Sequence, residues 1–84
     1  MARKRKPIKV IHRKLGREKV YGQAWTDFRV IEIDERLTGL DYLDTVIHEV
    51  MHVQQPSLPE KTVAKNATEL AEILWNLGIR WVDL

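Results

Sequence analysis

The first third of the chain carries strand-like patterns of hydrophobic and polar residues. Residues 28–34 alternate apolar with polar side chains over a full strand length, which is typical of a half-buried β-strand. Shorter apolar runs at residues 8–12 and 19–25 predict two further strands, the first an edge candidate because of its basic side chains. Thr26 and Asp27 suit a hairpin turn. We therefore expect a small antiparallel sheet of about three strands.

The pattern changes to a helical one after residue 37. Thr38 and Asp41 have the spacing of a capping box, in which Thr38 caps the helix and Asp41 reaches back to it. The helix should run to about Gln54. Its apolar side chains fall on one face, comprising Leu43, Val46, Ile47, Val50 and Met51. The opposite face carries Asp41, Asp44, Thr45, His48 and His52.

A second helix is expected from near Pro59 to Leu77, with Ser57 available as its cap and Gly78 following as a good terminator. Its apolar face comprises Val63, Ala64, Ala67, Leu70, Ala71, Leu74 and Leu77. Only a short turn separates the two helices, so they should form an antiparallel hairpin. The predicted fold class is α+β, with the small antiparallel sheet packed on this helical hairpin.

The length of 84 residues predicts a single domain, residues 1–84, with one modest core. Domains of this size often need a metal, disulfides or oligomerisation in addition to their core. The chain has no cysteine, which excludes disulfides and thiolate metal sites. No apolar run is long enough to span a membrane, and no secretory signal follows the basic N-terminus. We therefore expect a cytoplasmic protein.

Positive charge is concentrated before residue 20, although the formal net charge is only +2. Residues 1–7 form a basic arm, which we expect to be solvated and partly disordered. A weak contact with the phosphates of nucleic acid is the alternative, because such contacts need clustered cations. The cations that would make it are Arg3, Lys4, Arg5 and Lys6.

The candidate chemistry lies in the segment His48-Glu49-Val50-Met51-His52. Residues four apart on a helix lie one above the other, so His48 and His52 could bind one tetrahedral zinc ion. Glu49 is placed to accept a proton from a metal-bound water and to pass it to a leaving amine. An exposed pair of histidines beside a glutamate is the simpler structural alternative.

A catalytic zinc site needs a third protein ligand, and the sequence has no histidine after His52. A carboxylate is therefore expected, from Glu60, Glu69 or Glu72. By its helical position, Glu60 lies on the apolar face of the second helix. It also stands at the start of that helix, close to where the first helix ends. Glu69 would lie about 13 Å further along the axis. The geometry favours Glu60, whose alternative roles are a capping box with Ser57 or an interaction with the helix dipole.

The sequence does not assign two further roles near the metal. Asp44 lies one turn before His48 and could orient its imidazole, or could be a solvated acid near the helix start. A side chain that stabilises the oxyanion of a hydrolytic transition state is also needed. Four residues could supply it: His12, Tyr21, Tyr42 and Arg80.

Several segments of residues 21–81 together resemble a known family. They comprise Val30, Ile33 and Asp34, then residues 43–52, then Leu58 and Glu60, and finally Leu74, Trp75 and residues 77–80. This order resembles the short phage and bacterial zinc metallopeptidases of the zincin superfamily, which are similar in core to SprT-like and gluzincin domains. SprT-like domains take a later histidine as third ligand, and thermolysin-type spacing would select Glu72.

The resemblance implies a minimal zincin core with His48 and His52 as ligands, Glu49 as catalytic acid and base, and a downstream acidic ligand. We accordingly predict hydrolysis of peptide bonds in peptide or protein substrates, with one Zn²⁺ per chain held by His48, His52 and Glu60. Another zinc amide hydrolase, such as a deformylase, is one alternative. Another alternative is a catalytically silent module that is stabilised by its metal and binds nucleic acid through the basic arm.

Overall fold

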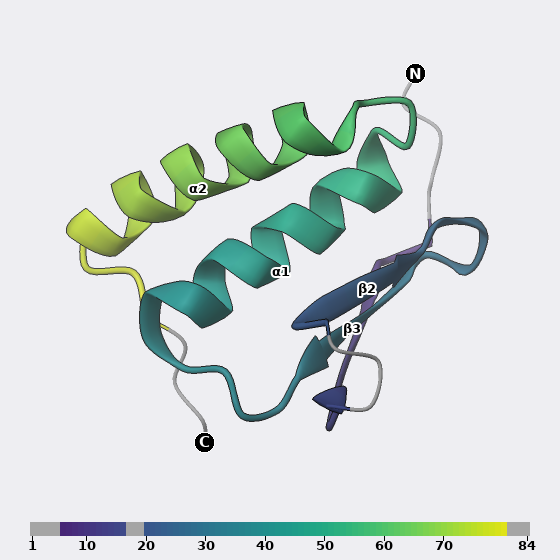
Figure 1. Cartoon of the computed structure of the whole chain (residues 1–84), viewed down its shortest axis with the longest axis horizontal. Helices are drawn as coiled ribbons and strands as arrows, with labels where there is room; N and C mark the ends of the chain where they lie inside the picture. Colours follow the sequence, from purple (N-terminus) through teal and green to yellow (C-terminus); the bar gives the residue numbers. More distant parts are fainter. Residues whose placement is uncertain (1–5, 17–19, 81–84) are drawn as a thin grey trace.

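A computed structural model describes residues 6–16 and 20–80 of the chain, so most of the basic arm and Lys19 lie outside the described residues. The elements are the strands β1 (Lys9–Arg13), β2 (Gly22–Trp25) and β3 (Val30–Asp34), a 3-10 turn η2 (Thr26–Phe28), and the helices α1 (Gly39–Gln54) and α2 (Glu60–Asn76). Figure 1 shows the three strands beside a pair of helices. The α+β fold class is confirmed.

The three strands form a mixed sheet with the order β1-β3-β2. β2 and β3 are an antiparallel hairpin in which Trp25 lies opposite Val30, and the expected turn at Thr26 and Asp27 is the η2 turn. β1 pairs with the other edge of β3 and runs parallel to it, with Lys9 opposite Val30. The prediction of a wholly antiparallel sheet was therefore wrong, because β1 joins the sheet across β3 and not as a hairpin partner of β2. Its predicted place at an edge is confirmed.

The core lies between the sheet and α1. Ile31 and Ile33 on β3 are fully buried and cluster with Val53 of α1. This burial explains why β3 takes the central position, since its apolar face is covered by the helix. Strand β3 begins at Val30 and not at residue 28, because Phe28 belongs to the η2 turn and is exposed.

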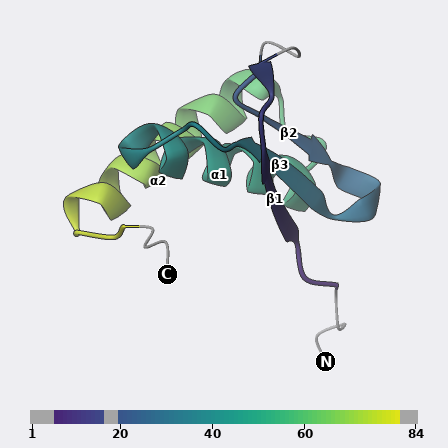
Figure 2. The same cartoon turned by 90° about the horizontal axis from the view of Figure 1, so that it is seen from below.

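The two helices pack against each other as the predicted antiparallel hairpin. α1 contacts β2, β3 and α2, so it lies between the sheet and the second helix (Figures 1 and 2). α2 buries Val63, Ala67 and Ala71, and the two alanines allow a close approach of the helices. Among the described residues, no helix is long and apolar enough to cross a membrane.

The helix ends differ from the predicted caps at both N-termini. Thr38 is the N-cap of α1 in an extended conformation, but its side chain makes no capping hydrogen bond. Pro59 and not Ser57 precedes α2, so Glu60 is the first residue of that helix. Glu60 therefore cannot be the fourth residue of a Ser57 capping box. The C-terminus of α2 is as expected: Gly78 has φ +91°, and Ile79 N–H donates to Leu74 O at 3.0 Å in a Schellman motif.

A buried carboxylate fixes the connection from β3 to α1. Asp34 is 3% exposed and accepts hydrogen bonds from the backbone N–H and the guanidinium of Arg36. These bonds hold the pKa of the Asp34 carboxyl well below its usual range. The ionised Asp34 thus holds the chain in the turn that leads into α1, the helix that carries the candidate metal ligands.

Candidate metal centre

His48 and His52 lie one turn apart on α1, as their spacing predicts. Their rings meet edge to face, with centroids 4.9 Å apart and an interplanar angle of 62°. Both side chains are largely buried, with 20% and 25% of their surface exposed. The Thr26 hydroxyl donates to His52 O at 3.4 Å, which ties the η2 turn to the end of α1. The two imidazoles are therefore held on an element packed against the sheet.

Glu60 reaches both imidazoles from the start of α2. Its Oε1 lies 2.7 Å from His48 Nε2, and its Oε2 lies 2.6 Å from His52 Nε2. The predicted proximity of Glu60 to the histidines is confirmed, and the short turn between the helices produces it. Glu69 and Glu72 are exposed residues further along α2 and do not belong to this group.

The three side chains offer a donor set that zinc commonly uses, two imidazole nitrogens and a carboxylate oxygen. One ligand atom from each lies within 4.8 Å of the others. In a tetrahedral zinc site such atoms are about 3.3 Å apart, so the Nε2–Oε contacts would have to open slightly. Glu60 can make that adjustment because 67% of its side chain is exposed. The residues present therefore fit a zinc ion.

Glu49 is the charged side chain that α1 buries, with 8% of its surface exposed. Burial raises the pKa of the Glu49 carboxyl, while the neighbouring His48 and His52 act to lower it. The negative charge of Glu60 acts in the same direction as burial. A carboxylate with a raised pKa beside candidate metal ligands is well suited to accept and release a proton.

A cavity of about 300 Å³ opens beside these residues. It is bounded by the start of β2, by α1 and by α2, and we call it the α1 pocket. Its lining residues are Val20, Tyr21, Gly22, Asp44, Thr45, His48, Glu49, Ala64 and Thr68. The pocket therefore leads from His48 and Glu49 along α1 towards the start of that helix.

The structure separates the four residues that could stabilise an oxyanion. Tyr21 lines the α1 pocket together with His48 and Glu49. His12 Nε2 and the Tyr42 hydroxyl are hydrogen bonded to each other at 2.8 Å. Tyr42 and Arg80 line a different cavity, described below. Tyr21 is thus the one of the four that shares a pocket with the candidate catalytic groups.

Asp44 has a hydrogen-bond partner that the sequence does not indicate. Its Oδ2 accepts a hydrogen bond of 2.8 Å from the Thr68 hydroxyl on α2. It also lines the α1 pocket and is only partly exposed. Asp44 therefore forms part of the pocket wall and connects α1 to α2 through this bond.

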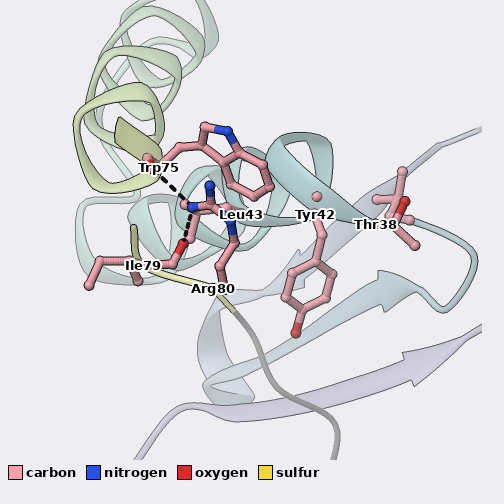
Figure 3. Close-up of a pocket in the computed structure, with 8 residues that line it drawn as sticks. Thr38, Tyr42, Leu43, Trp75, Ile79 and Arg80 are labelled. Atoms are coloured by element: carbon pink, nitrogen blue, oxygen red, sulfur yellow. Dashed lines mark hydrogen bonds between the residues drawn. The ribbon is translucent and has the colours of Figure 1, made fainter. Parts of the chain in front are cut away.

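A second cavity, of about 190 Å³, lies at the opposite end of the helical hairpin (Figure 3). The Arg80 guanidinium lies 3.4 Å from the centre of the Trp75 ring and donates to Trp75 O and Ile79 O, each at 2.9 Å. The start of α1, with Thr38 and Tyr42, forms the other wall. None of the candidate metal ligands lines this cavity.

Sequence patterns did not indicate several residues of the α1 pocket. Gly22 lies in β2, where a Cβ would come within 2.8 Å of Thr45 Cγ2. Thr45 and Thr68 are polar residues on separate helices, and no local pattern relates them. Only the packing of β2, α1 and α2 brings these residues to one pocket.

Comparison of the chain with family models, with curated proteins and with solved structures finds no match. The arguments for function therefore rest on the geometry of the site.

Proposed function

We propose that the chain is a zinc-dependent peptide hydrolase of the zincin type, with His48, His52 and Glu60 as zinc ligands and Glu49 as general base. The observation that most directly supports this proposal is the contact of the Glu60 carboxylate with Nε2 of both histidines, at 2.7 and 2.6 Å. Two imidazoles and one carboxylate leave a fourth position open for water in a tetrahedral site, which is the arrangement of catalytic zinc.

Zinc in this position would lower the pKa of a bound water and polarise the carbonyl of a peptide bond. Glu49 would accept the proton of that water and deliver it to the departing amide nitrogen. The raised pKa of Glu49 supports this role, because the carboxyl must take up the proton as well as release it.

Tyr21 is the residue we assign to the carbonyl oxygen. It lines the α1 pocket with Glu49, and 70% of its surface is exposed, so its hydroxyl is free to approach a substrate. A hydrogen bond from this hydroxyl would stabilise the negative charge that develops on the oxygen. Tyr21→Phe should therefore lower kcat more than it changes KM.

The sheet supports a peptide as the substrate class. In the described part of the chain β2 is the last strand on its side of the sheet, and the residues at its start line the α1 pocket. The free edge of such a strand can pair with an extended peptide. This favours a peptide over a small amide. The relationship to phage and bacterial zinc metallopeptidases and a cytoplasmic location remain parts of the proposal.

The decisive experiment compares the parent chain with Glu49→Gln after loading with zinc, using an unstructured test protein as substrate. The parent should cleave it, whereas Glu49→Gln should retain zinc and lose at least about 100-fold in rate. Equal rates would remove Glu49 from the mechanism. Bound zinc without cleavage by the parent would favour the silent module, and cleavage restricted to formylated peptides would favour a deformylase.

A further inference from the structure

The far end of the α1 pocket carries an acidic group that the proposed hydrolysis does not use. Asp44 lies one helical turn before His48, so the two residues are about 6 Å apart along the axis of α1. Both line the same cavity. A group bound at Asp44 would therefore lie about one helical turn from the candidate ligand His48.

The residues that line the pocket around Asp44 have small or hydroxyl-bearing side chains. Gly22 and Ala64 keep the cavity open, and Thr45 and Thr68 provide hydroxyl groups. The Thr68 hydroxyl donates to Asp44 Oδ2 at 2.8 Å, which orients the carboxylate across the gap between the helices. A carboxylate has about four acceptor positions, so this bond leaves acceptor capacity for a ligand.

Among the described residues, the pocket lining contains the carboxylates of Asp44 and Glu49 and the imidazole of His48, but no lysine or arginine. Within residues 6–16 and 20–80, no lysine or arginine forms an ion pair with Asp44, and Lys61 and Lys65 of α2 are not among the lining residues. An acidic pocket with an oriented carboxylate favours a cation.

We propose that the α1 pocket binds a basic side chain of the substrate next to the scissile bond, and that Asp44 determines this specificity. Lysine carries its cation at the end of a long flexible stem, which suits a pocket that runs from the candidate ligand His48 to Asp44, one helical turn away. The inference rests on the proposed hydrolase, because it assigns the substrate class of the same site. An apolar side chain of the same length would offer no hydrogen-bond donor to the remaining acceptor positions of the Asp44 carboxylate.

The first test measures binding without hydrolysis. The full chain in zinc-containing buffer is titrated with N-acetyl-lysine amide and with N-acetyl-norleucine amide, while the backbone amide signals of Thr45, Ala64 and Thr68 are followed by NMR. The lysine compound should bind about five- to tenfold more tightly, since the norleucine compound has the same stem without the charge. Asp44→Asn should remove the difference. Asp41→Asn is the control and should retain it, because Asp41 is an exposed acid in the first turn of α1 that does not line the pocket.

The second test measures cleavage of two peptides that differ only in lysine or norleucine beside the scissile bond. The ratio of their kcat/KM values should be about five to ten for the parent and for Asp41→Asn, and close to one for Asp44→Asn. Equal binding and equal cleavage by the parent would overturn the specificity while leaving the hydrolase intact. Selective binding of the lysine compound without any cleavage would instead support the cation site and overturn the hydrolase.

Discussion

Gly22 on β2 lies so close to Glu49 on α1 that a Cβ at position 22 would come within 3.0 Å of Glu49 Cγ. The same Cβ would also lie 2.8 Å from Thr45 Cγ2 and 3.2 Å from the backbone oxygen of Glu32. Two of the three obstacles are packed side chains of α1, and the third is the neighbouring strand. The absence of a side chain at Gly22 thus sets the distance between the sheet and the helix that carries the candidate site.

Gly22→Ala should consequently destabilise the protein by about 1 to 3 kcal/mol, because β2 or α1 must move to admit the methyl group. Thermal unfolding would show this as a Tm lower by at least about 4 °C. Gly16→Ala is the control, since the nearest atom to its Cβ belongs to the largely exposed Arg36 guanidinium, at 3.1 Å, and not to packed backbone or core. An unchanged Tm for Gly22→Ala would contradict the close approach of β2 to α1.

Replacement of the proposed ligands should separate Glu60 from the other acids of α2. His48→Ala, His52→Ala and Glu60→Ala should each weaken zinc binding by about 100-fold, because each removes a bond to the metal. Glu69→Ala and Glu72→Ala are the controls and should bind zinc like the parent. Zinc affinity measured by competition with a chelating dye tests this. Loss of zinc in Glu72→Ala with retention in Glu60→Ala would reverse the ligand assignment.

Zinc should also contribute to folding, because a core of this size is small and the site joins α1 to α2. The parent chain should therefore melt at a lower temperature after treatment with a chelator. The His48→Ala variant is the control and should show no such change, since it has little metal to lose. A parent Tm that is the same with and without chelator would argue against a structural contribution.

Acid should weaken the fold through Glu32 on β3. Its carboxylate accepts hydrogen bonds from Arg13 at 2.7 Å and from Gln23, which lower its pKa from 4.5 to about 2. A folded-state pKa below the ordinary value stabilises the protein above pH 4.5, and this contribution disappears as the pH falls towards 2. Glu32→Gln should thus cost about 2 kcal/mol at pH 7.

Denaturant unfolding of the parent and Glu32→Gln between pH 7 and pH 2.5 measures this difference. The two proteins should converge in stability as the pH falls below 4.5. Glu35→Gln changes an exposed acid in the following turn and serves as the control. A stability difference that does not vary with pH would show that Glu32 acts through packing and not through its charge.

The basic arm gives a prediction for the alternative function. Deleting residues 1–6 should weaken binding to DNA and reduce its dependence on salt. A protein that contacts fewer phosphates releases fewer counterions from the DNA when it binds. The zinc content should stay the same. A variant with the arm replaced by neutral residues of equal number controls for length. DNA binding that survives both changes would assign it to another surface.

Much of the site followed from helical periodicity alone. A period of 3.6 residues places His48 and His52 on one face of α1 wherever that helix lies. The same period places Glu60 in the phase of Val63 and Ala67, the residues of α2 that turn out to be buried. The short connection between the helices then brings Glu60 to His52. Because each step concerns neighbouring residues or one tight turn, no knowledge of the rest of the fold was needed.

Relationships between distant segments were decided by the folded chain. The parallel pairing of β1 with β3, the approach of Gly22 to Glu49 and the hydrogen bond of Thr68 with Asp44 each join elements far apart in sequence. Strand patterns report which residues are apolar, but the same pattern pairs in either direction and with several partners. The choice among these pairings depends on burying Ile31 and Ile33 under α1 while all the elements pack at once. The pattern of residues along one segment carries no information about how the other segments pack against it.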